Sequence, residues 1–152
     1  MVSTNVEQND IVSLWKDTFG DSEKEIKYFL ENCNDSQCVG VYADGHLVSM
    51  LFLVSCTVVG KPARYIYAAC TDADYRKRGC MTELLDYAKK NFQRLCLIPA
   101  EEWLIEYYKK RGFRFAISVD EICFNQTEEI TEYLFEGCEL ERPIALIYEG
   151  EL

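Results

Sequence analysis

The chain has 152 residues, 49% of them hydrophobic and 28% charged, which suffices for one domain with a core and excludes an intrinsically disordered chain. No apolar run approaches the roughly 18 residues of a membrane span, and the polar start MVSTNVEQND lacks the apolar segment of a secretion signal. The net charge of −10 argues against nucleic acid or a membrane surface as the main partner.

The first third of the chain predicts two helices. Four apolar residues share one helical face ahead of Gly20, where the first helix should end: Ile11, Val12, Trp15 and Phe19. Asp21 or Ser22 can cap a second helix. The apolar stripe of that helix consists of Ile26, Phe29, Leu30 and Cys33.

Strands are expected next, because the spacing of the apolar residues changes from that of a helix to that of a strand. Asp44-Gly45 is a strong signal for a two-residue hairpin, and Gly60-Lys61-Pro62 predicts a second turn. These turns separate three expected strands, which are Cys38–Ala43, His46–Val59 and Ala63–Thr71. The third is apolar on both faces, so we expect it to lie in the centre of a sheet.

The second half continues the alternation of helices and strands. The remaining expected elements are a helix Cys80–Phe92, a strand Leu95–Ile98, a helix Ala100–Lys110 ended by Gly112, a strand Phe113–Phe124 and a last strand Ile144–Tyr148. The tail beyond Phe124 is acidic and less regular. The order predicts an α/β (α+β) layer architecture with a mixed sheet in a single domain, residues 1–152.

The charge is unevenly spread along the chain. Residues 1–60 hold 3 Lys or Arg against 9 Asp or Glu, residues 61–119 hold 12 against 7, and residues 120–152 hold 1 against 10. The middle segment thus carries +5 in an acidic protein, which favours a local site for an anionic ligand. Ordinary variation along a solvated surface explains the charges equally well, so charge alone does not decide.

The eight cysteines form neither a disulfide pattern nor a metal-binding pattern. No pair is spaced C-x-x-C, and His46 is the only histidine, so Cys/His metal sites and a Cys–His catalytic pair are disfavoured. Four cysteines lie inside apolar runs, namely Cys56, Cys70, Cys96 and Cys123. We therefore expect free thiols in a reducing cytoplasm, and no metal.

The segment after the third strand carries the chemistry. Arg76, Lys77, Arg78 and Gly79 lie between a central strand and a helix N-terminus, where backbone N–H groups and the helix dipole favour an anion. Gly79 lets the backbone approach a ligand closely. This combination predicts a pyrophosphate cradle. It is neither a P-loop nor a dinucleotide fingerprint, because both glycine patterns are absent.

At these residues the chain resembles the GNAT superfamily of acyl-CoA-dependent N-acyltransferases. ACTDADYRKRGCMTELLDYA is similar to its motif A, in which a strand leads through Arg/Gln-x-x-Gly-x-Gly/Ala to a helix. Arg76 and Gly79 match, and Met81 replaces the last small residue. LCLIPAEEWLIEYYKKRGF resembles motif B, which ends in Tyr-x-x-x-Gly-Phe, here Tyr108 to Phe113. The resemblance covers roughly residues 9–124.

The resemblance implies a three-layer sandwich with a mixed, mostly antiparallel sheet and two splayed central strands, Ala63–Thr71 and Leu95–Ile98. It implies acetyl-CoA as co-substrate, with the backbone near Cys70 and Thr71 bonding the pantetheine arm. The pyrophosphate would be held by the amides of Arg78, Gly79, Cys80, Met81 and Thr82, and by the charges of Arg76 and Lys77. Tyr108 matches the tyrosine that protonates the departing thiolate.

The implied reaction is acetyl transfer to the primary amine of a small molecule or a peptide. It needs a neutral amine, a donor for the oxyanion such as a backbone N–H near Thr71, and a proton for the leaving thiolate. Tyr67, Glu101, Glu102 and a chain of water molecules remain alternatives for the base, so none is assigned. The acidic background favours a cationic acceptor.

Other interpretations stay open beside this one. Arg76–Arg78 could be a solvated loop, and Tyr108 could be a core residue. The domain could be a non-catalytic acyl-CoA-binding or regulatory module, because Met81 departs from the motif and no base is assigned. It could also be the N-terminal part of a larger acetyltransferase, with residues 125–152 leading into a further segment. A homodimer is compatible with all of these.

Overall fold

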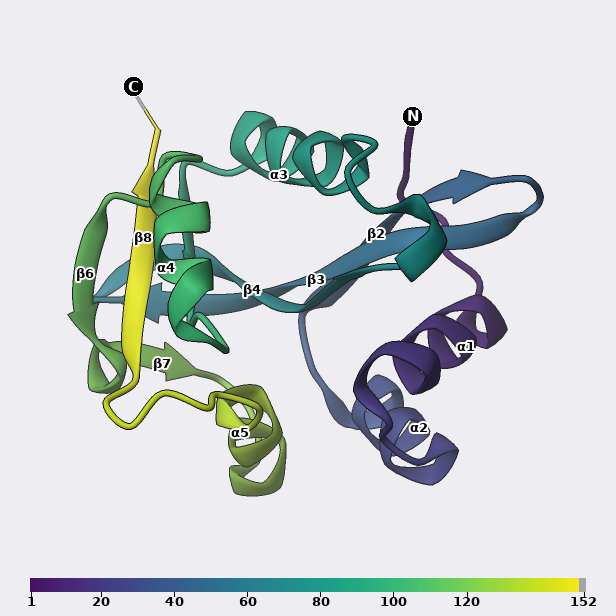
Figure 1. Ribbon diagram of the computed structural model, residues 1–152. Coiled ribbons are helices and arrows are strands. Elements are labelled where there is room, and N and C mark those ends of the chain that lie inside the picture. Colours follow the sequence, from purple (N-terminus) through teal and green to yellow (C-terminus); the bar gives the residue numbers. More distant parts are fainter. Residues whose placement is uncertain (151–152) are drawn as a thin grey trace.

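The computed structural model describes residues 1–150, and their eight strands form one sheet (Figure 1). The strand order is β1-β2-β3-β4-β5-β8-β6, and β7 pairs with β3. The strands are β1 (Val2–Ser3), β2 (Ser36–Ala43), β3 (His46–Val58), β4 (Lys61–Thr71), β5 (Arg94–Leu97), β6 (Phe115–Ser118), β7 (Ile122–Phe124) and β8 (Ile144–Glu149). Among these strands β4 and β5 pair in parallel, and the other pairs are antiparallel.

Helices cover both faces of the sheet, which gives the expected three layers. The helices are α1 (Gln8–Phe19), α2 (Glu23–Asn32), α3 (Cys80–Asn91), α4 (Glu102–Lys109) and α5 (Glu128–Phe135). Buried side chains of α1, α2 and α5 pack in one apolar cluster, and those of α3 and α4 pack in another. None of the helices in residues 1–150 has the length and apolar character needed to cross a bilayer.

The first helix ends, and the second begins, where the sequence predicts. Gly20 ends α1 in the left-handed region, with φ 74°. Ser22 caps α2 in a capping box: its hydroxyl accepts from the Glu25 N–H, and the Glu25 carboxylate accepts from the Ser22 N–H. Trp15 and Phe29 are buried on the inner faces of the two helices, which orients both against the sheet.

One predicted turn is displaced. Asp44 and Gly45 form the β2–β3 turn at φ 52° and 83°, as expected. The β3–β4 turn lies at Val59 and Gly60, at φ 49° and 77°, so Lys61 and Pro62 already belong to β4. The prediction of a turn at Gly60-Lys61-Pro62 is wrong because Pro62 lies in an extended strand, where its fixed φ is tolerated near the strand start.

The C-terminal third departs further from the prediction. The expected single strand Phe113–Phe124 is wrong, because a 3₁₀ turn at Val119–Glu121, begun by the Ser118 hydroxyl, divides it into β6 and β7. These two strands pair with different partners, β8 and β3. Helix α5 was not expected at all. The last strand is confirmed as β8, which lies inside the sheet between β5 and β6. A segment beyond residue 152 remains a prediction.

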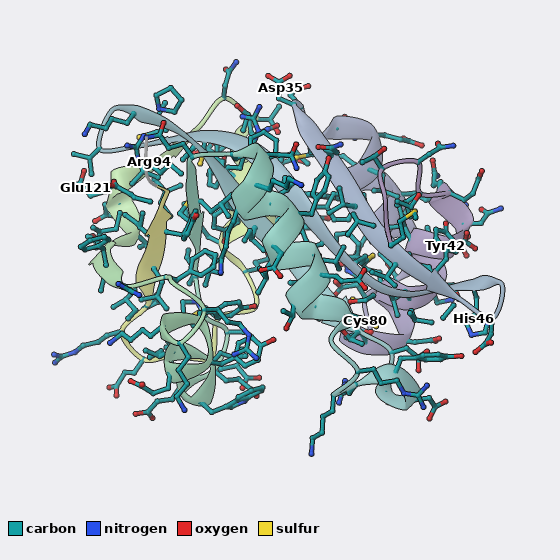
Figure 2. The ribbon with its side chains drawn as sticks, turned by 90° about the horizontal axis from the view of Figure 1, so that it is seen from above. Asp35, Tyr42, His46, Cys80, Arg94 and Glu121 are labelled. Carbon is teal, nitrogen blue, oxygen red and sulfur yellow. The ribbon has the colours of Figure 1, made fainter. Side chains whose placement is uncertain are left out.

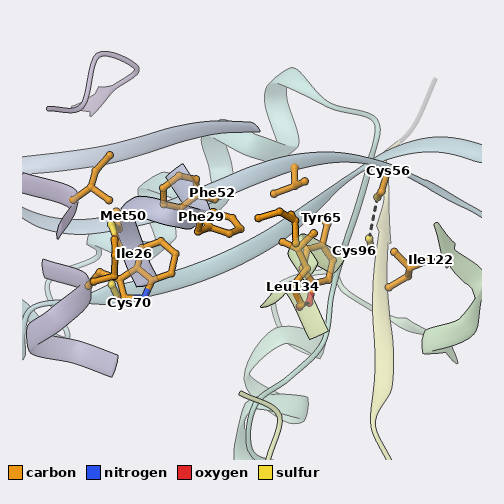
Figure 3. Packing of buried hydrophobic residues seen from close by; sticks show 14 of the residues in the cluster. Ile26, Phe29, Met50, Phe52, Cys56, Tyr65, Cys70, Cys96, Ile122 and Leu134 are labelled. Atoms are coloured by element: carbon orange, nitrogen blue, oxygen red, sulfur yellow. Dashed lines mark hydrogen bonds between the residues drawn. The ribbon is translucent and has the colours of Figure 1, made fainter. Parts of the chain in front are cut away.

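Alternate residues of β3 pack on opposite faces of the sheet. Phe52 and Val54 face α1, α2 and α5, whereas Leu51 and Leu53 face α3, as the period of two in a strand requires. Figure 3 shows the first cluster, in which the Phe29 and Phe52 rings lie 5.7 Å apart. The sulfurs of Cys56 and Cys96 lie 3.7 Å apart as free thiols in the same cluster, and the other six cysteines are free as well.

Candidate cofactor and acyl-transfer site

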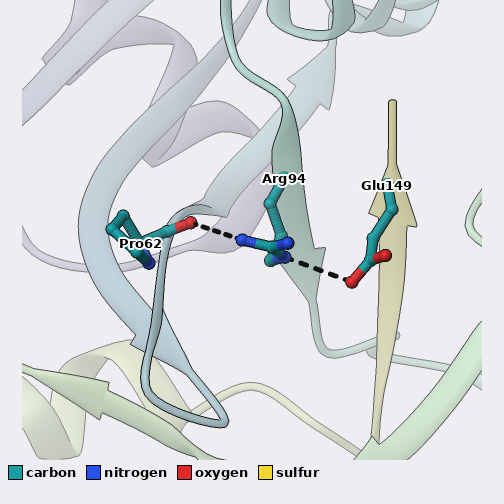
Figure 4. A network of polar contacts seen from close by, with 3 residues as sticks. All are labelled: Pro62, Arg94 and Glu149. Carbon is teal, nitrogen blue, oxygen red and sulfur yellow. Dashed lines mark hydrogen bonds and ion pairs between the residues drawn. The ribbon is translucent and has the colours of Figure 1, made fainter. Parts of the chain in front are cut away.

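Strands β4 and β5 are joined at one end only. They pair at two positions, Arg64 with Leu95 and Tyr65 with Cys96. At this closed end the Arg94 guanidinium donates to the Pro62 carbonyl of β4 and to the Glu149 carboxylate of β8, both at 3.2 Å (Figure 4). The Arg94 side chain is 15% exposed and that of Glu149 is 48% exposed, so the guanidinium links three strands while its carboxylate partner stays open to water.

Beyond this pairing the two strands separate into the predicted splay. The chain after β5 is held by the loop between α5 and β8 instead of by β4. The Cys138 thiol donates to the Pro99 carbonyl at 3.3 Å, and the Glu139 N–H donates to the Ala100 carbonyl at 2.8 Å. The two strands therefore open into a wedge towards the C-terminal end of β4.

A bulge in β4 lies beside the wedge. Met50 pairs with Cys70 and Phe52 with Tyr67, so two residues of β4 stand opposite one residue of β3. Ala68 occupies the left-handed region at φ 53°, which is unusual for a residue with a side chain. The bulge changes the alternation of β4 and sets the direction of the backbone groups that follow it.

At the end of β4 the backbone of Thr71 turns towards the wedge. The next residue, Asp72, donates its N–H to the Val48 carbonyl of β3 at 2.7 Å. Backbone groups alternate between the two edges of an antiparallel strand, so those of Thr71 point away from β3 and those of Cys70 point towards it. Burial raises the pKa of the Cys70 thiol to about 12, so it is not a nucleophile at neutral pH.

The loop after β4 is braced by the tip of the β2–β3 hairpin. Tyr75 donates its hydroxyl to Asp44 at 2.5 Å, and this bond raises its pKa. The His46 ring packs against the edge of Tyr75 at 5.9 Å, and the Arg78 guanidinium lies 5.0 Å from the Tyr75 ring centre. Figure 2 shows His46 on the same side of the molecule as Cys80, the first residue of α3.

The N-terminus of α3 has the geometry of an anion site. Lys77 and Gly79 both adopt the left-handed region, at φ 63° and 83°. In residues 1–150 no hydrogen bond engages the N–H groups of Cys80, Met81 or Thr82, and Gly79 supplies no side-chain cap. A Cβ on Gly79 would meet nothing within 4 Å, so the backbone that leads into α3 is open on this side. The site therefore fits a pyrophosphate.

Two further observations complete the cradle. The Arg76 side chain donates to the Thr71 carbonyl at 3.3 Å, which places its charge between the wedge and the helix N-terminus. The Met81 side chain packs against the apolar cluster under α3, so it points inwards and leaves its N–H at the helix surface. Eight of the nine residues proposed for the cofactor therefore lie around the end of β4 and the start of α3: Thr71, Arg76, Lys77, Arg78, Gly79, Cys80, Met81 and Thr82. The ninth, Cys70, turns its backbone towards β3 and its thiol towards the cluster under α1 and α2, so it does not face the wedge.

Tyr108 lies on the inner side of α4, in the same apolar cluster as Ile66 and Leu97, which flank the opening of the wedge. Its side chain is only 8% exposed. Its hydroxyl has no hydrogen-bond partner in residues 1–150. The hydroxyl is not fully buried, however, so solvent reaches it. Burial and then Tyr107 raise its pKa above the ordinary value, and Arg111 lowers it slightly.

The three side chains considered as bases take different places. Glu101 accepts a hydrogen bond from the exposed indole of Trp103 at 2.6 Å, and Glu102 is the first residue of α4, where a carboxylate suits the helix dipole. Tyr67 lies at the wedge and points to the face opposite α3, against Trp15 at 5.8 Å and Phe29 at 5.1 Å.

An acidic aromatic face surrounds Tyr67, and sequence reasoning did not find it. We define this face by the residues Trp15, Tyr67, Tyr133, Asp21, Glu25, Glu129 and Glu136. Burial, followed by the Asp21 and Glu136 carboxylates, raises the pKa of Tyr67. Three of these seven residues come from α5 and its C-terminal end, and only the acidity of the tail hints at them in sequence.

Known proteins share this architecture. The family model of the acetyltransferase (GNAT) domain matches residues 3–116, about three quarters of the chain. No curated protein matches the sequence significantly. A GNAT acetyltransferase from Bacillus cereus superposes with a TM-score of 0.65 at 14% identity, covering 100% of this chain and 98% of that one.

Two larger proteins contain the same fold. A probable N-acyltransferase from Enterococcus faecalis has a TM-score of 0.57 at 19% identity, covering 74% of this chain and 31% of its own. N-acetylglutamate synthase from Neisseria gonorrhoeae, solved with coenzyme A and N-acetyl-glutamate, has a TM-score of 0.62 at 14% identity, covering 100% of this chain and 35% of its own. The present chain thus spans about a third of each.

Proposed function

Because this chain belongs to the acetyltransferase (GNAT) domain family, a family of acyltransferases, we propose that it transfers an acetyl group from acetyl-CoA to a primary amine. The observation that carries the proposal is the wedge between β4 and β5, which opens beside the free amides at the N-terminus of α3. The end of the β4–β5 pairing beside these amides supports a cofactor that lays its pantetheine arm along β4 and its pyrophosphate at α3.

In this proposal the amides of Cys80, Met81 and Thr82 hold the pyrophosphate, and Arg76 adds charge beside them. The backbone of Thr71, which faces the wedge, bonds the pantetheine arm and offers an N–H near the reacting carbonyl. When bound, the co-substrate supplies a thioester whose acyl carbon accepts the amine nitrogen while its carbon–sulfur bond breaks.

Tyr108 holds the proton that the departing sulfur requires. Its raised pKa keeps the hydroxyl protonated at neutral pH, and the hydroxyl is not fully buried, which supports this role. As the sulfur gains negative charge, the hydroxyl donates to it, and the proton released by the amine returns to Tyr108 through water. Cys70 takes no covalent part, because its thiol remains protonated.

We propose a cationic amine as the acceptor, arriving at the face opposite α3. Tyr67 is the first residue beyond the last β4–β5 pair that points to this face, so the acidic aromatic face adjoins the opening of the wedge. Carboxylates attract a second positive charge on the acceptor, and aromatic rings stabilise it by cation–π contact. The reacting nitrogen itself must be neutral, so a diamine suits the site.

The decisive experiment is calorimetric titration of the reduced protein with acetyl-CoA, comparing Gly79→Glu with Gly60→Glu. Both glycines have φ near 80° and open space around the Cβ, so both variants should incur a similar backbone strain of about 1–2 kcal/mol. Gly60 directly precedes the opposite end of β4, up to roughly 36 Å from Thr71 at about 3.3 Å per residue.

We expect micromolar binding by the wild type and by Gly60→Glu, and loss of at least about tenfold in affinity for Gly79→Glu, because a carboxylate would occupy the anion site. Binding that is equal in both variants would refute the cradle. Binding without turnover in a screen of amines would leave a non-catalytic acyl-CoA-binding module, the second candidate function, as the better description.

A further inference from the structure

A pair of hydroxyl groups, one of them fully buried, links β3 to the end of β4. Ser49 of β3 stands opposite Thr71 of β4, and their hydroxyl oxygens are 2.8 Å apart. The Ser49 oxygen also lies 3.2 Å from the Cys70 carbonyl. Ser49 is 0% exposed and is the one fully polar side chain buried in the core of the described residues.

The pair faces the cofactor side of the sheet. Met50 and Cys70, the next residues along the two strands, pack in the cluster under α1 and α2. Neighbouring residues of a strand point to opposite faces, so Ser49 and Thr71 point towards α3. The Thr71 side chain is partly exposed there, close to the loop that leads to the cradle.

Only one placement of the hydroxyl hydrogens makes both bonds. A carbonyl can only accept, so Ser49 must use its single hydrogen towards Cys70. Thr71 must then donate its own hydrogen to Ser49. The Thr71 oxygen is left with lone pairs and no hydrogen to give, so towards a ligand it can act only as an acceptor.

We propose that Thr71 Oγ1 accepts a hydrogen bond from an amide N–H of the pantetheine arm, and that Ser49 is the positioning residue that holds it in this state. The inference rests on the proposed function. The Thr71 carbonyl accepts from Arg76 on one of its two lone pairs, and the hydroxyl beside it, whose hydrogen is given to Ser49, is a second acceptor at this point of the wedge. An amide N–H is the donor that a pantetheine arm offers.

The test compares two ligands that differ only in this arm. Coenzyme A carries the pantetheine, whereas adenosine 3′-phosphate 5′-diphosphate has the same nucleotide and pyrophosphate without it. Thr71→Val removes the hydroxyl at nearly constant volume, and Thr71→Ser keeps it. The measured quantity is the ratio of the two dissociation constants, which a merely destabilised protein would not change.

We expect Thr71→Val to weaken coenzyme A by about 3- to 10-fold, the range of one neutral hydrogen bond, and to leave the truncated ligand unchanged. Thr71→Ser should retain the wild-type ratio. Ser49→Ala should shift the ratio in the same direction, but add nothing in the Thr71→Val background, because Ser49 acts through Thr71.

Three results would overturn the inference. An unchanged ratio in Thr71→Val refutes the hydroxyl contact while leaving the cradle intact. An additive effect of Ser49→Ala in the double variant refutes its positioning role. Wild-type protein that binds neither ligand refutes the proposed function itself, and this inference with it.

Discussion

Tyr108→Phe separates catalysis from stability, because the structure gives the hydroxyl no partner in the described chain. The substitution keeps the buried ring and its contact with Phe113, whose centre lies 5.7 Å away. No hydrogen bond is lost and no group is left unsatisfied, so the free energy of unfolding should change by less than about 0.5 kcal/mol. A melting temperature within about 2 °C of the wild type is expected.

The effect on turnover should be far larger. A positioned general acid contributes about 10²- to 10⁴-fold, so kcat should fall by at least about 100-fold, equivalent to roughly 2.7 kcal/mol at 1.36 kcal/mol for each tenfold step. Affinity for acetyl-CoA should stay within about threefold of the wild type, because the hydroxyl acts on the leaving sulfur and not on the nucleotide.

Tyr65→Phe is the matched control. Tyr65 is also a buried tyrosine near the wedge, but its hydroxyl donates to the Leu134 carbonyl at 2.6 Å. Its loss leaves a carbonyl at the end of α5 without a partner, at a cost of about 1–3 kcal/mol, which lowers the melting temperature by about 2–12 °C. Turnover per folded molecule should be unchanged.

The kcat for amine acetylation and the melting temperature of the two variants test whether Tyr108 is the general acid. A kcat for Tyr108→Phe within threefold of the wild type would show that water protonates the thiolate and that Tyr108 is a core residue. A drop in melting temperature as large as that of Tyr65→Phe would show that its hydroxyl has a structural partner.

Three more outcomes follow from the same geometry. A general acid works only while it is protonated, and burial raises the pKa of Tyr108. A profile of kcat against pH should therefore show no fall due to this group up to about pH 10. A fall near pH 8–9 would assign the proton to another residue. Arg94→Ala removes the contacts that close the wedge to Pro62 and Glu149, and should lower the free energy of unfolding by about 1–3 kcal/mol in urea titration, whereas an unchanged midpoint would leave the closure to backbone pairing alone. Glu136→Gln should raise the KM for 1,4-diaminobutane more than that for n-butylamine, with the difference shrinking in 0.5 M salt; equal changes would remove the carboxylates from acceptor recognition.

The local parts of the site are predictable because short-range rules govern them. Gly79 before an amphipathic segment marks the start of α3, and three cations before it indicate the anion site that we propose there. Gly20, Ser22 and the Asp44-Gly45 turn follow equally local preferences for φ and capping. In each case a few adjacent residues determine the backbone, so the chain carries the information within one window.

The predictions that are wrong concern segments in which long-range strand pairing overrides local preference. Val59 adopts a positive φ although β-branched residues avoid it, because β3 and β4 must pair through Val58 and Lys61. Phe113–Phe124 has the apolar pattern of one strand, but its two halves belong to separate strand pairs. Propensity favours an extended chain in both cases and cannot choose the partner.

The wedge itself depends on contacts that no local pattern contains. Its bulge places Ala68 at φ 53° without a glycine to mark it, and its far wall is held by Cys138 and Glu139, about forty residues after β5. The same acidic tail adds β8 beside β5 and brings Glu136 near Tyr67, on the face that we propose for the acceptor. The tail is thus a structural wall of the site and a source of its negative charge. Changes in α5 should therefore alter acceptor choice while leaving the cradle at α3, on the opposite face of the sheet, unaffected.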